Sequence, residues 1–246
     1  MDRLIYTAMT GANAAAQRQS VLSNNLANAS TNGFRAELST YRAVPLRGDG
    51  ATTRVFALEA TAGHLDLPGP GQRTGRDLDA MPQGNAWFAV QGLDGTEAYT
   101  RNGSFEVAQD GTLMTSNGLT VLSDGGAPVA APPNSQVSIG FDGTLSAKVA
   151  GQPSTNVGRL KLVTPTLDNP LKRSPDALFR TAGGDPLPND PNAKLQSGVL
   201  EGSNVNSVET MVGMIQTARQ FEVQMRLLQN AEANDRSAGQ LLGLQG

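Results

Sequence analysis

The chain has 246 residues and a net charge of −3 with no run of lysine and arginine, which argues against nucleic-acid binding. Its hydrophobic content of 38% excludes a wholly disordered protein, while 28 glycines and 14 prolines favour turns and short strands over long helices in much of the sequence. Cysteine is absent, which excludes disulfides, thiolate zinc sites and cysteine nucleophiles.

A helix is predicted within residues 1–34, because apolar residues recur at spacings of three and four between Leu4 and Leu26. This alternation is typical of a coiled-coil seam, and its central alanines would let a partner helix approach closely. Asn32-Gly33 follows as a stop signal, since Gly33 can adopt the left-handed conformation, in which asparagine would be tolerated better than valine. The seam residues predicted to lie at a subunit interface are Ile5, Ala8, Ala12, Ala15, Leu22 and Leu26, and Gln19 interrupts them.

Residues 35–84 show no sustained hydrophobic period and are predicted to form an extended linker with one or two strands. Residues 85–195 are predicted to form an antiparallel β domain, sandwich-like or barrel-like, because Asp-Gly and Asn-Gly dipeptides recur at the spacing of hairpin turns. In the clearest hairpin, Asp142-Gly143 joins Val137–Phe141 to Thr144–Val149, and apolar residues alternate along both arms. One face of this hairpin is therefore expected to be buried.

A second helix is predicted over residues 207–246, after a return segment at 196–206. Ser207 is a suitable N-cap, and Glu209 lies in the first turn, where the helix dipole favours an acid. Spacings of three and four define a second seam, for which ordinary core packing is the alternative interpretation. Its predicted interface residues are Met211, Met214, Ala218, Phe221, Met225 and Leu228, widened by Ile215. The predicted fold class is α+β, a central all-β domain flanked by N- and C-terminal helices that pair in a coiled-coil-like core.

No catalytic or metal-binding group can be assembled from the sequence. The one histidine, His64, has no serine and aspartate arrangement around it and is interpreted as a surface or packing residue. No phosphate-binding or dinucleotide-binding glycine pattern is present. Asp77 and Asp79 could form a carboxylate pair for glycoside hydrolysis, but a chain with one tryptophan has few platforms for a sugar. We therefore expect no cofactor, no metal, no small-molecule substrate and no enzyme activity.

Three motifs stand out along the chain: Ser23–Phe34 (SNNLANASTNGF), Tyr99–Phe105 (YTRNGSF) and Ser197–Val205 (SGVLEGSNV). They resemble signatures of one family, the flagellar rod and hook proteins. The first is similar to the family's N-terminal signature, in which Asn-Leu-Ala-Asn precedes Thr-x-Gly-Phe. The second resembles its β-domain signature, and the third resembles the segment that returns the chain to its C-terminal helix. Within the family the chain is most similar to proximal rod members, with distal rod members as the near alternative. The motif residues expected at subunit interfaces are Asn25, Asn28, Thr31, Gly33, Phe34, Asn204 and Val205.

The resemblance implies a structural subunit of the flagellar rod, whose terminal helices would build an inner tube decorated by the β domain. The implied partners are other copies of the chain, neighbouring proximal and distal rod proteins, and the flagellar type III export apparatus, which would deliver the unfolded chain to the periplasm. Export without a cleaved signal would fit a start, Met1–Thr7, that lacks a secretory pattern. The longest apolar run, Ala86–Val90, is too short for a membrane span.

Two hypotheses from other classes remain open. The first is a secreted glycan-binding β domain that uses the helices as an oligomerisation stalk, and it predicts an exposed aromatic platform. The second is a glycan-cleaving enzyme, which predicts that turnover is lost on Asp77→Asn or Asp79→Asn.

Overall fold

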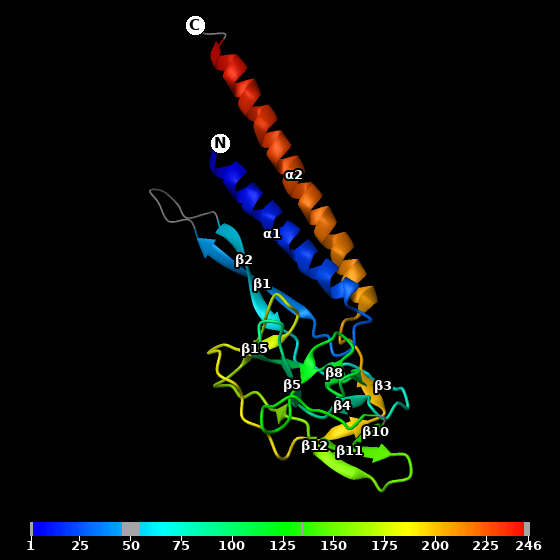
Figure 1. Ribbon diagram of the computed structural model, residues 1–246. Helices are drawn as coiled ribbons and strands as arrows, with labels where there is room; N and C mark the ends of the chain where they lie inside the picture. The colour runs from blue at the N-terminus through cyan, green and yellow to red at the C-terminus, as the bar shows by residue number, and fades with distance from the viewer. Residues whose placement is uncertain (1, 46–54, 134, 244–246) are drawn as a thin grey trace. The chain divides into compact units, whose positions relative to one another are not determined.

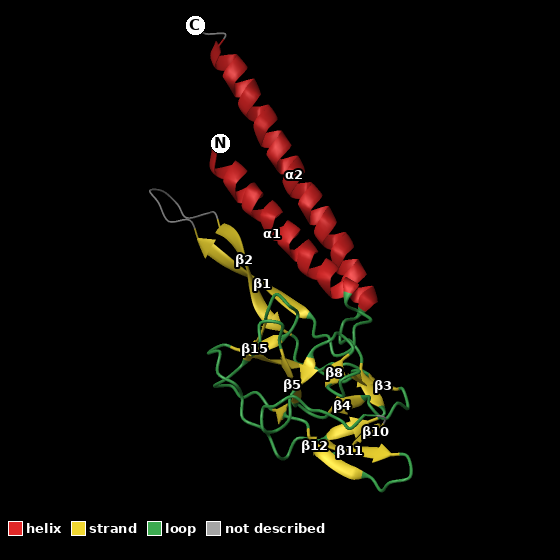
Figure 2. Cartoon of the chain, viewed as in Figure 1, coloured by secondary structure: helices red, strands yellow, loops and turns green. Residues whose placement is uncertain are grey.

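The computed structural model describes residues 2–45, 55–133 and 135–243, which divide into two compact units that are described separately. The helical unit contains Met1–Ala29, Glu37–Gly63 and Val205–Gly246, and the β unit contains Ser30–Ala36 and His64–Asn204. The chain therefore passes between the units four times. Figure 1 shows the course of the chain, and Figure 2 shows its helices and strands. The predicted α+β class is confirmed.

The helical unit is built on two helices, α1 (Asp2–Ala27) and α2 (Ser207–Gly243), which pack against each other. Asn206 caps α2, because its Oδ1 accepts hydrogen bonds from the amides of Val208 and Glu209 at 3.1 and 3.2 Å. Ser207, the cap predicted from the sequence, is instead the first helical residue. The asparagine one position earlier reaches the free amides of the first turn.

The segment predicted as a linker, residues 35–84, contains four strands. β1 (Glu37–Pro45) and β2 (Val55–His64) form a two-stranded sheet, and residues 46–54 between them lie outside the described part of the chain. β3 (Gly71–Arg73) and β4 (Ala80–Pro82) lie in the β unit. Both faces of β1 are largely exposed, so its sequence shows no alternation of apolar and polar residues from which a strand could be predicted.

Asn25 fixes β1 to α1 within the helical unit. Its Nδ2 donates a hydrogen bond to the carbonyl oxygen of Glu37, and its Oδ1 accepts one from the Glu37 amide, both at 2.9 Å. The side-chain amide thus takes the place of a neighbouring strand. Farther along, the Tyr41 hydroxyl donates to the carbonyl oxygen of Ala14 at 3.3 Å, and the Arg18 guanidinium lies 5.9 Å from the Tyr41 ring centroid. These contacts support a hairpin that would be marginally stable alone.

The centre of the β unit is an eight-stranded antiparallel sheet. Its order is β14-β15-β6-β5-β9-β8-β7, and β13 pairs with β5 outside that path. One face packs on the larger hydrophobic core, and a second cluster gathers around Trp87, Tyr99 and Phe179. The strands are β5 (Trp87–Gln91), β6 (Glu97–Thr100), β7 (Phe105–Val107), β8 (Leu113–Thr115), β9 (Thr120–Val121), β13 (Leu162–Val163), β14 (Leu171–Arg173) and β15 (Phe179–Thr181).

A three-stranded sheet contains the hairpin predicted from the sequence. Its strands are β10 (Ser135–Ile139), β11 (Thr144–Val149) and β12 (Thr155–Arg159). The hairpin is confirmed, since Val137 pairs with Ala147 and Ile139 with Leu145, and all four side chains are buried. Phe141 does not continue the buried face, because it lies beyond the end of β10 and is exposed.

Two short strand pairs join the beginning of the β unit to its end. β4 pairs with β16 (Leu195–Ser197), and β3 pairs with β17 (Val199–Glu201). Residues that are more than a hundred positions apart in the sequence are thereby neighbours.

Among the described residues, neither helix is long and apolar enough to cross a bilayer.

Candidate functional site

In the contact between α1 and α2, a glycine of one helix meets a longer side chain of the other. Gly11 of α1 lies against Gln224, and Leu22 lies against Gly213 of α2, where an added Cβ would come within 3.4 Å of the leucine. Such residues allow close approach of two helices but bury little apolar surface. Most buried side chains of the two helices are small, among them Ala8, Ala12, Ala14, Ala15, Thr210, Thr217 and Ala231.

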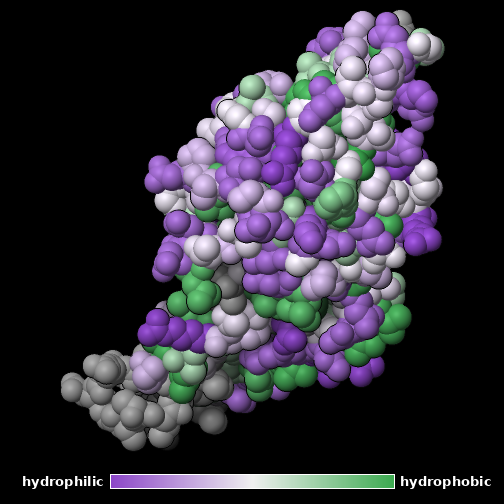
Figure 3. All heavy atoms as spheres, turned by 90° about the horizontal axis from the view of Figure 1, so that it is seen from below, coloured by the Kyte–Doolittle hydropathy of each residue, from purple (hydrophilic) through white to green (hydrophobic). Residues whose placement is uncertain are grey.

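Large apolar side chains of α2 are left on the surface. Val208, Met211, Val212 and Ile215 are 70%, 50%, 49% and 55% exposed. Their spacing of i, i+3, i+4 and i+7 places them on one face, which we call the α2 apolar face. Figure 3 shows, on the side of the molecule that it presents, hydrophobic residues in separate patches among hydrophilic ones. Further exposed apolar residues of α2 are Phe221, Val223, Met225 and Leu227.

The two predicted seams differ in how much of each is buried. The α1 seam faces α2, with Ala8, Ala12 and Ala15 buried and Ile5, Leu22 and Leu26 half-buried. The α2 seam is left largely uncovered, with Met211, Ile215, Ala218, Phe221 and Met225 exposed and Met214 and Leu228 half-buried. The residues of α2 that face α1 instead are Thr210, Gly213 and Thr217. These small residues recur at spacings of three and four. That pattern could have identified the face of α2 that packs on α1, because closely packed helices carry small residues at their contact.

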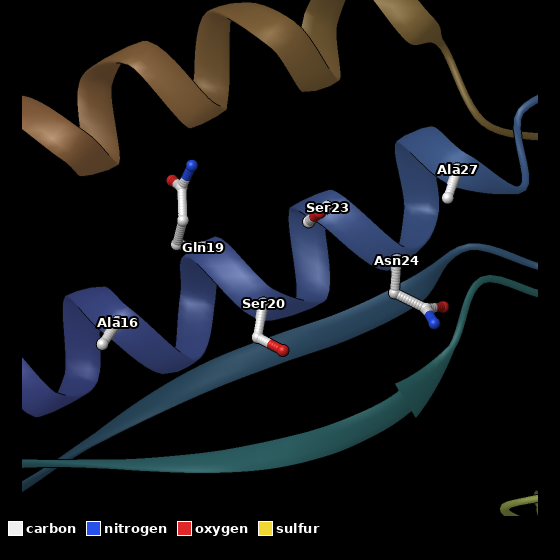
Figure 4. A pocket seen from close by; sticks show the side chains of 6 residues that line it. All are labelled: Ala16, Gln19, Ser20, Ser23, Asn24 and Ala27. Carbon is white, nitrogen blue, oxygen red and sulfur yellow. The ribbon is translucent and has the colours of Figure 1, made fainter.

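A groove runs along one side of α1 (Figure 4). Gln19 points toward α2, whereas Ser20 and Asn24 point toward the side of α1 on which β1 and β2 lie. The Oε1 atom of Gln19 is buried and has no hydrogen-bond partner among the described residues. The lining consists of Ala16, Gln19, Ser20, Ser23, Asn24 and Ala27, so it presents no charged side chain, histidine or cysteine.

The motif residues at the end of α1 serve the local backbone. Asn25 is buried and holds β1. Asn28 is half-buried, and its Nδ2 donates a hydrogen bond to the carbonyl oxygen of Asn24 at 2.9 Å. Thr31 is exposed, and its carbonyl oxygen accepts a hydrogen bond from the Phe34 amide at 3.3 Å. The side chains of Asn25 and Asn28 therefore bond backbone groups of β1 and of the last turn of α1.

Gly33 lies so close to neighbouring backbone that there is no room for a side chain. Its φ is 69°, and its amide donates a hydrogen bond to the carbonyl oxygen of Glu201 at 2.7 Å. An added Cβ would lie 2.4 Å from the carbonyl carbon of Arg101. The next residue, Phe34, is buried, and the guanidinium of Arg173 lies 4.5 Å from its ring centroid. Both residues therefore fix the motif within the β unit.

A buried ionic cluster joins this motif to the other two. Glu201 is 0% exposed and lies between Arg35 and Arg101, which are 2% and 1% exposed. Its Oε1 is 2.7 Å from Arg35 Nη1, and its Oε2 is 2.6 Å from Arg101 Nη2 and accepts from Arg101 Nε at 2.8 Å. The amide of Gly69 donates to Oε1 at 3.0 Å. We call these three charged residues the Glu201 cluster; sequence reasoning missed them as functional candidates.

The two guanidinium groups of the Glu201 cluster share one tryptophan. Arg35 and Arg101 lie 5.9 and 5.7 Å from the Trp87 ring centroid. Arg101 also donates to the carbonyl oxygens of Pro82 and Gly84 at 3.1 and 3.0 Å. Burial lowers the pKa of both arginines, and Glu201 opposes that effect. An arginine remains protonated after such a shift, so two cations lie buried around one carboxylate.

Asn204 ties together the chain segments that lead into the helical unit. Its Oδ1 accepts a hydrogen bond from the amide of Ala36 at 2.7 Å. Its Nδ2 donates to the carbonyl oxygens of Leu65 and Leu67 at 2.9 and 2.8 Å. Val205 follows at once and is half-buried. Asn204 and the Glu201 cluster thus gather, within the β unit, segments at all four places where the chain passes between the units.

His64 is a packing residue, as the sequence predicted. Its ring centroid lies 4.7 Å from that of Phe179 and 6.2 Å from that of Trp87, and its Nε2 is 2.8 Å from Asp66 Oδ1. Burial lowers the pKa of His64, which the Asp66 carboxylate opposes. The nearby cations that add to this lowering of the pKa are Arg35 and Arg173.

The possible carboxylate pair is divided between two environments. Asp77 is exposed and accepts a hydrogen bond from Gln136 Nε2 at 3.0 Å. Asp79 is buried, 3.6 Å from Arg76 Nη1, and neither of its carboxylate oxygens has a hydrogen-bond partner among the described residues. Trp87 is buried as well and presents no platform to a sugar. These positions give no support to glycan binding or cleavage.

Three family models match successive parts of the chain. The flagella basal body rod protein model matches residues 5–35, which include most of α1 and the N-terminal motif. The flagellar hook protein FlgE/F/G D1 domain model matches residues 82–147. The model of the flagellar basal body rod FlgEFG protein C-terminal region matches residues 196–241, which include the return segment and most of α2.

Curated proteins are similar over nearly the whole chain. The flagellar basal-body rod protein FlgF of Salmonella typhimurium is 44% identical, over 99% of this chain and 100% of that protein. FlgF of Caulobacter vibrioides is 32% identical, over 99% of both. The flagellar basal-body rod protein FlgG of Buchnera aphidicola subsp. Schizaphis graminum is 31% identical, over 93% of this chain and 95% of its own length.

Proposed function

The chain belongs to the family of flagellar basal-body rod proteins and is a structural subunit of the rod, and we propose that its place is the proximal rod. The proximal assignment is supported by the 44% identity to FlgF of Salmonella typhimurium, against 31% to FlgG of Buchnera aphidicola subsp. Schizaphis graminum. The similarity to FlgG keeps the distal rod as the alternative position.

The α2 apolar face is the observation that carries the proposed mode of assembly. Fully burying one large apolar side chain contributes about 1.5–3 kcal/mol, yet the α1–α2 contact buries mainly alanine, glycine and threonine. The isolated subunit leaves Val208, Met211, Val212 and Ile215 in water. We infer that neighbouring subunits cover this face in the rod.

The proposed interface extends to the other predicted positions. It includes the exposed residues of the α2 seam and the edges of the α1 seam, which half-buried Ile5 and Leu22 leave partly open. The buried motif residues have an indirect part in it, since Asn25 and Gly33 hold the backbone at the end of α1. The proposed partners are other copies of this chain and the neighbouring rod proteins.

The proposed mechanism is mechanical. The rod would transmit torque through many such helix contacts, with the helices in an inner tube and the β unit outside it. The Glu201 cluster and Asn204 would give the β unit a stiff attachment for the four connecting segments, because their hydrogen bonds join those segments directly. We further propose assembly in the periplasm after export of the unfolded chain by the flagellar type III apparatus, as the family assignment suggests.

Single substitutions on the α2 apolar face test the proposed assembly. Met211→Asp and Ile215→Asp place a carboxylate where a partner would bury it unpaired, which is strongly unfavourable. Each variant should keep its folded β unit but fail to enter basal bodies in a strain that lacks the natural subunit. Gln216→Asp introduces the same charge beside the face and should assemble. Normal basal bodies that contain Met211→Asp would contradict the proposal.

A further inference from the structure

The first strands of the β unit depend on its last strands. β3 and β4 each form a two-stranded sheet, with β17 and β16 as their respective partners. Among the described residues, neither pairs with any other strand in a sheet. A chain that ended before Leu195 would therefore lack the strand partners of both.

Two buried arginines of the β unit are neutralised by Glu201, which belongs to the same C-terminal part of the unit. Arg101 is separated from Glu201 by 100 positions, and the two are joined by buried contacts of 2.6 and 2.8 Å. Without Glu201, the guanidinium groups of Arg35 and Arg101 would be buried against one tryptophan without that counter-charge. Removing one partner of a buried ion pair is much more damaging than never burying the pair.

The backbone depends on this segment too. The amide of Gly33 donates to the carbonyl oxygen of Glu201, and Asn204 binds the backbone at Ala36, Leu65 and Leu67. A short stretch at the end of the β unit thus completes hydrogen bonds, strand pairs and charge neutralisation at its beginning.

We propose that Glu201 is a fold-completion latch. The β unit gains its stable packing in one late step, when the segment 195–204 docks, and its central sheet does not persist without that step. Long-range contacts of this kind form slowly, because the loop between them must close first. The use of such a latch rests on the proposed function, since a subunit exported unfolded benefits if its unfinished chain cannot fold.

The chain carries its own probe of the latch. Its single tryptophan, Trp87, is 1% exposed and lies beside both arginines of the Glu201 cluster. Trp87 fluorescence should therefore change as the cluster forms and as Trp87 packs against His64 and Phe179.

Refolding of the full-length chain from urea tests the proposal. Glu201→Gln keeps the shape of the side chain and removes its charge, and should lower the folding equilibrium constant by at least about a hundredfold. Most of this loss should appear as slower refolding, because the contact forms in the rate-limiting step. The control is Glu97→Gln, which removes a carboxylate that pairs with Lys161 at 2.7 Å and accepts a hydrogen bond from the Tyr99 hydroxyl at 2.8 Å. This variant should act mainly on the unfolding rate. A Glu201→Gln chain that refolds at the wild-type rate would overturn the latch.

Pulsed hydrogen exchange on the wild-type chain keeps the test decisive if Glu201→Gln does not fold. Amides of β5 and β6 should become protected at the same rate as those of β16 and β17. Earlier protection of β5 and β6 would overturn the latch and leave the proposed rod assembly untouched. Conversely, normal basal bodies with Met211→Asp would contradict the proposed assembly and leave the latch untouched.

Discussion

Replacing Gly33 by alanine adds one methyl group at a position where the structure leaves no room for it. The φ of 69° at Gly33 lies in the left-handed region, which costs an alanine about 1–2 kcal/mol. The added Cβ would also lie 2.4 Å from the carbonyl carbon of Arg101 and 2.5 Å from the amide nitrogen of Asn102. Both are backbone atoms, so the chain must shift, and overpacking of this kind costs about 1–3 kcal/mol.

We therefore expect Gly33→Ala to lower the free energy of unfolding of the β unit by about 2–5 kcal/mol. Urea denaturation followed by Trp87 fluorescence measures this loss. Gly75→Ala is the matched control, because Gly75 has a φ of 73° but nothing within 4 Å of an added Cβ. The control should lose only the conformational part, about 1–2 kcal/mol. Equal losses for the two variants would refute the steric part of the reasoning.

The same geometry changes what the sequence predicts for larger residues at Gly33. Conformational preference alone favours asparagine over valine in the left-handed region. In the structure both residues carry a Cβ that meets the backbone of Arg101. We therefore expect both variants to lose stability beyond the alanine control at Gly75.

Three further outcomes are expected. Burial lowers the pKa of folded His64 below its ordinary 6.5, so the β unit should have its full stability above pH 6.5 and lose stability as the pH falls from 6.5 toward the folded pKa. His64→Phe should flatten this slope in thermal unfolding, and an unchanged slope would contradict the assignment. Ala177 has a φ of 64°, so Ala177→Gly should relieve backbone strain and raise the free energy of unfolding by up to about 1 kcal/mol. A lower free energy of unfolding in urea denaturation would contradict this expectation. Amides of α1 and α2 should exchange faster than those of β5 in the dilute subunit, because the helix pair buries mainly small residues; strong protection of both helices without oligomers would point to a stable helical pair.

Local patterns in the sequence were sufficient for the helices and for one hairpin. Helical spacing identifies α1 and α2, and alternation around Asp142-Gly143 identifies β10 and β11. Both are patterns of neighbouring residues, so no knowledge of the tertiary fold is needed. The β1–β2 hairpin could not be predicted in this way. Both faces of β1 are largely exposed, so its sequence has no alternation of apolar and polar residues.

The side of α2 that faces α1 could not be found by looking for large apolar residues. That search selects Met211, Phe221 and Met225, whereas the contact uses Thr210 and Thr217. The usual rule assumes that a helix buries its largest apolar side chains within its own chain. An assembling subunit departs from that rule, because part of its core is completed by neighbours.

The Glu201 cluster could not be predicted from local patterns, because its three residues are far apart in the sequence. Isolated charged residues are ordinarily exposed, and nothing local indicates that Arg35, Arg101 and Glu201 share one buried site. The available signal was their position, since each lies within or directly after one of the three family motifs. Arg35 directly follows the first motif, whereas Arg101 and Glu201 lie within the other two.

Solvent access at Ile215 tests most directly whether the α2 apolar face is the subunit interface. The chain contains no cysteine, so Ile215→Cys provides a single thiol at a position that is 55% exposed in the subunit. We expect a maleimide reagent to label this thiol rapidly in the free subunit, and to label it in intact basal bodies only after they are dissociated. Equal labelling of the free subunit and of the intact basal body would contradict the proposal that neighbouring subunits cover this face.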